Sequence, residues 1–129
     1  MSERQMVLIV DDELDVCWAL STLLRQHGFA TATVTSGAEA LRWLAHPEQA
    51  SQLILIDAKL GDIDGADLAK RIRAETSCIS PMIMVSGYFY KDDSLVQEML
   101  RTSLIAAFVT KPFHHDEILK TIRVVLSAE

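Results

Sequence analysis

The stretch LIVDDELD, residues 8–15, places three carboxylates directly after an apolar run. Clustered carboxylates repel one another, and burial makes the ionised form of each more costly. A buried strand that ends on Asp11, Asp12 and Glu13 therefore needs compensating charge nearby. The rest of the sequence indicates where that charge lies.

Five short apolar runs alternate with amphipathic stretches along the chain. The runs are MVLIV (6–10), ATATV (30–34), LILI (53–56), MIMV (82–85) and AAFV (106–109). Four of the five are continuously apolar, which is typical of parallel strands that helices cover on both faces. ATATV alternates between apolar and polar residues instead, which favours a strand at the edge of the sheet.

The stretches between the runs carry the signals of helices. Leu20 and Leu24 belong to a series of apolar residues at helical spacing. Residues 36–39, Ser-Gly-Ala-Glu, form a capping box that opens the second helix. Leu95 and Met99 mark the apolar face of the fourth helix. Five strand–helix units in 129 residues predict an α/β fold with one doubly wound, five-stranded parallel sheet.

The expected strand order is 2-1-3-4-5, the flavodoxin-like order, because it places the alternating strand 30–34 at an edge. The first and third strands are then neighbours, and the topology reverses between them. Ligands bind in the crevice at the carboxyl ends of the strands at such a point. We therefore expect a three-layer (βα)5 sandwich, a single domain over residues 1–129, with its ligand crevice beside Asp11.

Composition excludes several classes of protein. Half of the residues are hydrophobic, which argues against general disorder. The net charge is −6 and the basic residues are scattered, so we expect no nucleic-acid surface. No apolar run has the length of a membrane span and no signal peptide is visible, so we expect a cytoplasmic protein. Cys17 and Cys78 lack metal-ligand spacing and are expected to be packing residues.

Polar residues stand at the carboxyl ends of four expected strands. Asp11 and Asp12 follow the first, Asp57 the third, Ser86 the fourth, and Lys111 comes soon after the fifth. Three carboxylates in one crevice are tolerable around a hard cation, and Mg²⁺ prefers carboxylates, waters and phosphate oxygens. An aspartate is also a nucleophile toward phosphorus, so the set predicts formation of an aspartyl phosphate.

Each of these residues also has a purely structural interpretation. Acidic residues at 11–13 can cap the first helix and complement its dipole. Asp57 can be a turn residue at a strand end, and Lys111 can be a solvated surface lysine. Their convergence on one crevice favours the functional interpretation over the structural one.

Together these residues resemble the receiver domain of bacterial two-component response regulators, of the CheY-like superfamily. The resemblance covers essentially the whole chain and rests on Asp11-Asp12, Asp57, Ser86-Gly87 and Lys111-Pro112-Phe113. It implies a signalling switch of a two-component system or phosphorelay and not an enzyme. The phosphoryl donor would be a phosphohistidine on a histidine kinase or a histidine phosphotransfer protein, and the cofactor would be Mg²⁺.

The resemblance also implies a role for each residue of the metal and phosphoryl site. Asp57 would be phosphorylated and would bind Mg²⁺ together with Asp12, with Asp11 through water, and with the backbone carbonyl of Lys59. Lys111 would contact the phosphoryl oxygens.

A second group of residues would transmit the signal. Ser86 would also contact the phosphoryl oxygens, and with Phe108, which would turn inward on phosphorylation, it would form the switch. The Lys111-Pro112 peptide bond would be cis. The face formed by the fourth helix, the fifth strand and the last helix would then bind a second copy of the chain or an output partner.

Three departures from the family pattern concern loops and this signalling face. Gly61 replaces the usual proline, which would make its loop more mobile, and the segment 86–111 is longer than usual. Leu104 and Ile105 replace the usual small residues before the fifth strand. They either form an exposed apolar patch that binds a partner or fill a gap in the core.

Two rival functions remain as alternatives. A phosphatase of the haloacid dehalogenase type would need a second Asp two residues after its nucleophile, whereas Glu13 stands two residues after Asp11. A phosphorylation-independent adaptor with a receiver fold would be expected to have lost acidic residues or the lysine, and this chain retains them.

Overall fold

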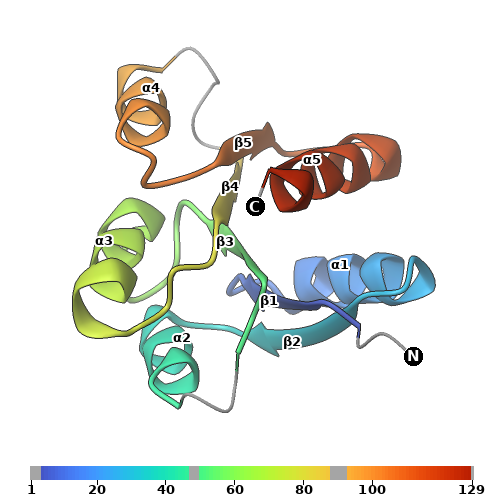
Figure 1. Ribbon diagram of the computed structural model, residues 1–129, viewed down its shortest axis with the longest axis horizontal. Coiled ribbons are helices and arrows are strands. Elements are labelled where there is room, and N and C mark those ends of the chain that lie inside the picture. The colour runs from blue at the N-terminus through green and yellow to red at the C-terminus, as the bar shows by residue number, and fades with distance from the viewer. Residues whose placement is uncertain (1–3, 47–49, 88–92, 129) are drawn as a thin grey trace.

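The computed structural model describes residues 4–46, 50–87 and 93–128, in which strands and helices alternate along the chain (Figure 1). The strands are β1 (Met6–Val10), β2 (Ala30–Val34), β3 (Leu53–Asp57), β4 (Met82–Ser86) and β5 (Ala107–Thr110). The helices are α1 (Leu14–Gln26), α2 (Gly37–Leu44), α3 (Gly65–Glu75), α4 (Ser94–Arg101) and α5 (His115–Ser127). Of the helices described, none is long and apolar enough to cross a membrane.

The strands form one parallel sheet in the order β2-β1-β3-β4-β5, which confirms the predicted order and the edge position of β2. Figure 1 shows α1 and α5 on one side of the sheet and α2, α3 and α4 on the other. Residues of β1 alternate between the two cores, because Val7 and Ile9 pack toward α1 and α5 while Leu8 and Val10 pack toward the opposite helices. Burial on both faces explains why the central strands are continuously apolar.

Helices α2 and α4 differ from the sequence prediction in detail. In α4 the buried residues are Val96 and Met99, whereas Leu95 is 41% exposed. A spacing of three residues keeps Val96 and Met99 on one helix face, and Leu95 lies about 100° away around the helix. The capping box of α2 forms on one side only: Ser36 accepts from the amide of Glu39, but the Glu39 carboxylate accepts from the amide and hydroxyl of Thr35.

Leu104 and Ile105 fill the core, which decides between the two interpretations of these residues. Ile105 is 1% exposed, and Leu104 is half-buried against the same apolar cluster. Ser103 has φ 61°, and the amides of Leu104 and Ile105 both donate to the carbonyl of Met99, so the chain turns back beneath α4. The expected exposed patch at these two residues is therefore not formed.

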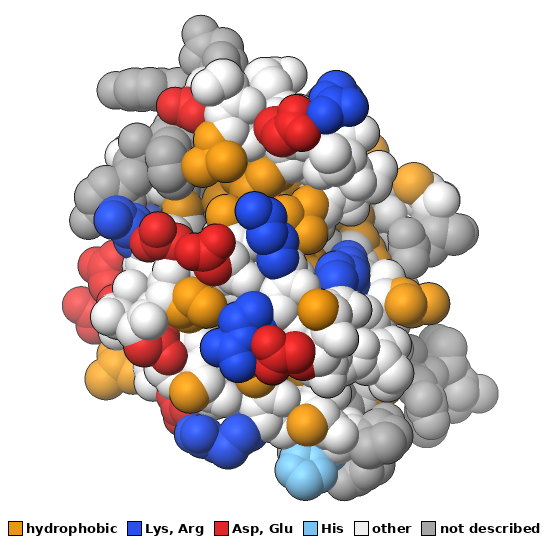
Figure 2. All heavy atoms as spheres, turned by 90° about the vertical axis from the view of Figure 1, so that its left-hand side faces the viewer, with side chains coloured by type: hydrophobic (Ala, Val, Ile, Leu, Met, Phe, Trp, Pro, Cys, Tyr) orange, Lys and Arg blue, Asp and Glu red, His pale blue; other side chains and the backbone are white. Residues whose placement is uncertain are grey.

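Acidic and basic side chains intermingle on the face that carries α2, α3 and α4 (Figure 2). The coloured side chains in this view form no continuous region of one charge. Exposed pairs such as Arg71–Glu75 and Arg101–Glu98 account for part of this mixture. On the face shown, cations and anions are therefore mixed and not separated into patches.

The loop between β3 and α3 is tied to the start of α2 through Asp62. Its carboxylate accepts hydrogen bonds from the amides of Gly37 and Ala38, at 2.9 and 3.0 Å. Within the loop, the amide of Leu60 donates to the carbonyl of Ile63. The mobility expected from Gly61 stays a prediction. The long segment after Ser86 was expected to be unusual, and its residues 88–92 lie outside the described part of the chain.

Replacing Asp62 with Ala should destabilise α2, because two amides of its first turn lose their acceptor. A helix cap contributes about 1 kcal/mol, so we expect a loss of about 0.5–1 kcal/mol at this exposed position. The same hydrogen bonds lower the pKa of Asp62, so its contribution is present at neutral pH and is lost as the pH falls through that lowered pKa. Urea unfolding and amide exchange of residues 37–40 would measure the effect.

Asp62→Asn serves as the control, since it retains one carbonyl oxygen and should lose less stability than Asp62→Ala. Equal stability of Asp62→Ala and the wild type at pH 7 would contradict the assignment.

Candidate functional site

The carboxyl ends of the strands bring the expected site residues to one edge of the sheet. Asp57 is the last residue of β3 and Ser86 the last residue of β4. Asp11 follows β1, and Lys111 follows β5. Since β1, β3, β4 and β5 are consecutive neighbours in a parallel sheet, all four positions lie along the same edge. The structure therefore brings the predicted site residues to one edge of the sheet.

Four carboxylates cluster in this crevice. Oxygen atoms of Asp11, Asp12, Glu13 and Asp57 all lie within 4.8 Å of one another. Asp11 and Asp57 are buried, whereas Asp12 and Glu13 are exposed. Sequence reasoning assigned three carboxylates to the metal site and left Glu13 out. Its position two residues after Asp11, at the start of α1, is the signal that could have included it.

Lys111 compensates these charges. Its Nζ donates to Asp11 Oδ2 at 2.9 Å and lies 3.7 Å from Glu13 Oε1 and 3.8 Å from Asp57 Oδ1. Only 18% of the Lys111 side chain is exposed, so solvent screens these interactions incompletely. The ammonium group thus supplies the compensating charge that three acidic residues after a buried strand require.

Both carboxylate oxygens of Asp11 already have partners. Oδ2 accepts from Lys111, and Oδ1 accepts from the amide of Glu13 at 2.9 Å. Glu13 is the N-cap residue of α1 and makes no side-chain cap hydrogen bond itself. Asp11 Oδ1 thus accepts from the N-cap residue itself and caps no amide of the first turn of α1, while Oδ2 belongs to the charge cluster.

Asp57 and Lys111 have pKa values shifted by this environment. Burial raises the pKa of Asp57 to about 6; the charge of Lys111 opposes this and that of Asp11 adds to it. Burial works against the charged form of Lys111, but the hydrogen bond and charge of Asp11 outweigh it and the pKa of Lys111 is raised. A perturbed carboxyl group beside a cation that is only 18% exposed is typical of a functional site.

The backbone around Asp57 is closely packed. A Cβ atom at Gly65 would overlap the carbonyl oxygen of Asp57 and lie 2.9 Å from the Cα of Ala58. The amide of Gly65 donates to the carbonyl of Ala58, and the amide of Lys59 donates to Asp57 Oδ1 at 3.5 Å. Glycine at position 65 therefore lets α3 begin directly against the end of β3. Metal binding by the Lys59 carbonyl stays a prediction.

The two expected switch residues lie on neighbouring strands and are both buried. Ser86 is 0% exposed at the end of β4, and Phe108 is 4% exposed on β5, within the core under α4. The ring of Phe108 already lies inward, so the expected inward turn is not needed to bury it. The Lys111-Pro112 peptide bond is cis, as predicted.

Comparison with known proteins identifies the family. The model of the response regulator receiver domain matches residues 7–123, which includes every site residue described above. The chain belongs to the response regulator receiver domain family. Among curated relatives, this receiver domain is 36% identical over 121 residues to the sensory transduction protein RegX3 of Mycobacterium tuberculosis, across 93% of this chain and 50% of that protein. It is 31% identical over 121 residues to the transcriptional regulatory protein ZraR of Escherichia coli, across 94% of this chain and 26% of that protein.

Solved structures show the same fold. The CheY-like receiver domain protein from Methanospirillum hungatei superposes with a TM-score of 0.84 at 23% identity, across 98% of this chain and 96% of that one. The receiver domain of a putative LuxO repressor from Vibrio parahaemolyticus gives a TM-score of 0.84 at 20% identity, across 98% and 92%. This receiver domain spans half or less of the length of the curated relatives named above.

Neutralising Asp57 should stabilise the metal-free receiver domain in a pH-dependent way. Because burial raises the pKa of Asp57 from 3.8 to about 6, its ionisation costs the folded state free energy as the pH rises through that range. Asp57→Asn should therefore gain about 3 kcal/mol in free energy of unfolding at pH 7.5. The gain should shrink to less than half at pH 4.5.

Urea unfolding in EDTA at both pH values measures this difference. Asp67→Asn, which neutralises an exposed carboxylate on α3, is the matched control and should change stability little at either pH. A gain for Asp57→Asn that is independent of pH, or a loss at pH 7.5, would contradict the electrostatic account.

Proposed function

We propose that this receiver domain is a phosphoryl-accepting switch whose acceptor is Asp57. The observation that carries the proposal is a buried carboxylate at the end of β3 with the ammonium group of Lys111, whose side chain is 18% exposed, 3.8 Å away. An Asp carboxylate can act as a nucleophile, and a nearby cation stabilises the charge that develops on a transferred phosphoryl group. The matching family model and the relatives named for sensory transduction and transcriptional regulation support a signalling role.

The proposed donor is a phosphohistidine on a sensor kinase or a histidine phosphotransfer protein. A carboxylate oxygen of Asp57 attacks phosphorus, the bond between phosphorus and the histidine nitrogen breaks, and the histidine takes up a proton. The reaction leaves this domain with an acyl phosphate and the donor with a neutral imidazole. This chain contributes the nucleophile and positions it, so it is a substrate of the signalling reaction and assists it.

Lys111 is the residue whose contacts would change most. It donates to Asp11 at 2.9 Å and lies 3.8 Å from Asp57, so a phosphoryl group on Asp57 would offer it a second strong acceptor. Ser86 ends the neighbouring strand and would donate its hydroxyl to the same group. Such contacts, present only in the phosphorylated state, are what can shift a conformational equilibrium.

The donor set suits Mg²⁺. Hard divalent cations prefer oxygen ligands, and the four clustered carboxylates supply only oxygen. Asp12, Asp57 and the carbonyl of Lys59 would bind the ion directly, and Asp11 would bind it through water because both its oxygens already accept hydrogen bonds. When bound, Mg²⁺ would neutralise negative charge on the phosphoryl oxygens.

The proposed output surface is the face formed by α4, β5 and α5, which would bind a second copy or an output partner. Ser86 on β4 pairs with Thr110 on β5, and Phe108 on β5 packs in the core under α4, so the site is physically connected to this face. Val124 on α5 is exposed, whereas the exposed Leu95 of α4 lines a pocket together with Asp67 and Lys70 of α3. With Phe108 already inward, the signal would pass through Ser86, Lys111 and β5, not through an inward turn of the ring.

Phosphorylation at Asp57 is tested with acetyl phosphate and Mg²⁺. Borohydride trapping and mass spectrometry should locate the adduct at Asp57, and EDTA should suppress it. Asp57→Asn should abolish the adduct, and Lys111→Met should reduce its rate at least tenfold, because removing one charged group at a transferred phosphoryl costs several kcal/mol.

Asp67→Asn is the control and should be phosphorylated like the wild type. An adduct at Asp12 or Glu13, or one that persists in Asp57→Asn, would contradict the proposal. Equal labelling in the presence of EDTA would contradict the metal assignment alone.

A further inference from the structure

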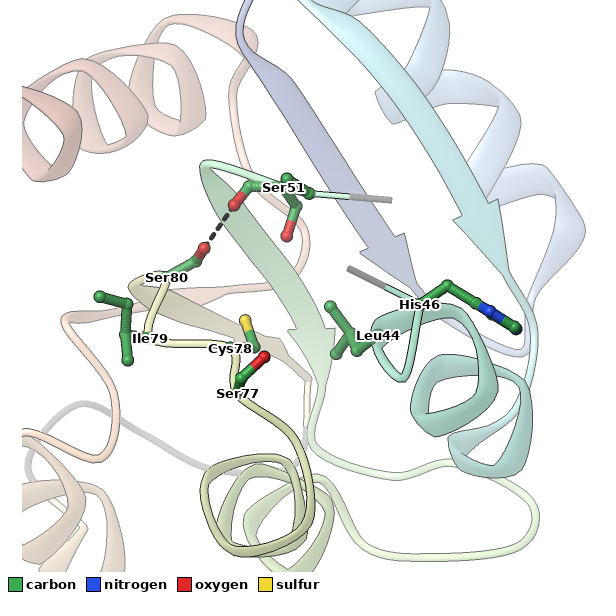
Figure 3. A pocket seen from close by; sticks show the side chains of 8 residues that line it. Leu44, His46, Ser51, Ser77, Cys78, Ile79 and Ser80 are labelled. Carbon is green, nitrogen blue, oxygen red and sulfur yellow. Dashed lines mark hydrogen bonds between the residues drawn. The ribbon is translucent and has the colours of Figure 1, made fainter. Parts of the chain in front are cut away.

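A second pocket lies at the opposite end of the sheet from Asp57. It has a volume of about 200 Å³ and is formed where β3 and β4 begin. Figure 3 shows its walls, which come from the end of α2, the residue that precedes β3 and the segment that leads into β4. The lining residues used below are Leu44, Ser51, Ser77, Cys78, Ile79 and Ser80. None of the phosphoacceptor residues contributes to this pocket.

The hydroxyl group of Ser51 is buried without a partner. Ser51 is 8% exposed, and among the residues that the structure describes its Oγ accepts and donates no hydrogen bond. The backbone carbonyl of Ser51, in contrast, accepts from Ser80 Oγ, which fixes the position of the residue. Figure 3 shows the Ser51 hydroxyl pointing into the pocket. Buried polar groups are nearly always hydrogen-bonded to protein, water or a ligand, so this hydroxyl is a donor and acceptor open to a group that occupies the pocket.

The thiol of Cys78 faces the same space. Cys78 is half-buried, and Figure 3 shows its sulfur directed into the pocket, toward Ser51. Its backbone is held at both ends, because its amide donates to Thr76 Oγ1 at 3.1 Å and its carbonyl accepts from Arg73 at 3.1 Å. The sulfur therefore lies at a fixed place on the pocket wall, beside open volume.

The other thiol has a different environment. Cys17 is 4% exposed, and its sulfur donates to the carbonyl of Asp11 at 3.2 Å. Burial raises the pKa of Cys17, which disfavours the reactive thiolate. Cys17 thus behaves as the packing residue expected from the sequence and serves as an internal control for Cys78.

We propose that Cys78 is a modification site that undergoes thiol–disulfide exchange with a low-molecular-weight disulfide, whose transferred half occupies this pocket and hydrogen-bonds Ser51. The Cys78 thiol loses its proton and its sulfur attacks one sulfur of the small disulfide. The new S–S bond joins Cys78 to that half, the old S–S bond breaks, and the other half leaves as a thiolate that takes up the proton. The small disulfide is the oxidant, so the step needs no further reagent.

The pocket also defines the group that fits. A cavity of about 150 Å³ can hold benzene, so a volume of about 200 Å³ accepts a thiol of only a few non-hydrogen atoms beside the sulfur. Among the residues that the structure describes, His46 is the one titratable side chain besides Cys78 in its lining, and no acidic residue, lysine or arginine is among them, which favours an uncharged group. Leu44 and Ile79 provide apolar contact, and Ser51 provides the hydrogen bond. A short hydroxyalkyl thiol combines these properties.

The test is a competition between bis(2-hydroxyethyl) disulfide and diethyl disulfide, which differ in the hydroxyl group. The two adducts on Cys78 are quantified by mass spectrometry after equilibration in the folded protein and in urea. Folding should raise the ratio of hydroxyethyl to ethyl adduct about threefold to tenfold, because one buried hydrogen bond is gained. Cys17 should stay unmodified in the folded protein. An unchanged ratio, or equal modification of Cys17, overturns the proposal.

Two variants separate the hydrogen bond from general effects on folding. Ser51→Ala should remove the preference for the hydroxyethyl adduct, whereas Ser77→Ala, at an exposed position on the pocket rim, should retain it. Removing an unpartnered buried hydroxyl should leave the melting temperature of unmodified Ser51→Ala equal to or above that of the wild type. A preference that persists in Ser51→Ala, or a lower melting temperature, overturns the proposal.

Discussion

The hydrogen-bonded ion pair between Lys111 and Asp11 is the interaction on which the crevice depends. It joins residues one hundred positions apart in sequence and holds a cation among four carboxylates, two of which are buried. Removing one partner from a buried pair commonly costs several kcal/mol, because the remaining charge stays uncompensated. Asp57 Oδ1 lies 3.8 Å from Lys111 Nζ, which is close enough for electrostatic attraction but too long for a hydrogen bond. The arrangement is thus stable in itself and still able to accept a new anionic group.

The parallel sheet makes this arrangement possible. All carboxyl ends of the strands point to one edge, and the topology reverses there between β1 and β3. The amino ends of the same strands form the opposite edge, where Ser51 and Cys78 line a separate pocket. The two sites lie at opposite ends of the same strands and share no residue. A reaction of Cys78 therefore leaves the carboxylates and Lys111 unchanged.

Much of the fold and the site could be predicted because both depend on patterns local in sequence. The four continuous apolar runs and the one alternating run were enough to predict the strand order. The site residues Asp11, Asp57 and Ser86 could be predicted because each directly follows one of these runs. The sequence could not show that Ile105 is buried under α4, because its burial depends on the backbone turn after α4 that forms in three dimensions. Periodicity likewise misassigned Leu95, since α4 is short and a rotation of one residue changes which side chain is buried.

Contacts between segments that are distant in sequence could not be predicted for the same reason. The hydrogen bonds from the first turn of α2 to Asp62 join that helix to the loop between β3 and α3. The hydroxyl of Ser51, which has no partner among the described residues, is visible only once its surroundings are known. Neither residue belongs to a motif. Satisfaction of polar groups is a property of the folded molecule as a whole, so single-sequence patterns do not contain it.

The central claim is that Asp57 is the acceptor and that Lys111 changes its partner when the acceptor is occupied. The most direct measurement is a crystal structure of the domain with Mg²⁺ and beryllofluoride, a mimic of the phosphoryl group. The account predicts beryllium bonded to a carboxylate oxygen of Asp57, with Lys111 Nζ and Ser86 Oγ within hydrogen-bonding distance of its fluorines. Beryllium on Asp12 or Glu13, or a Lys111 that contacts only Asp11 in that complex, would contradict it.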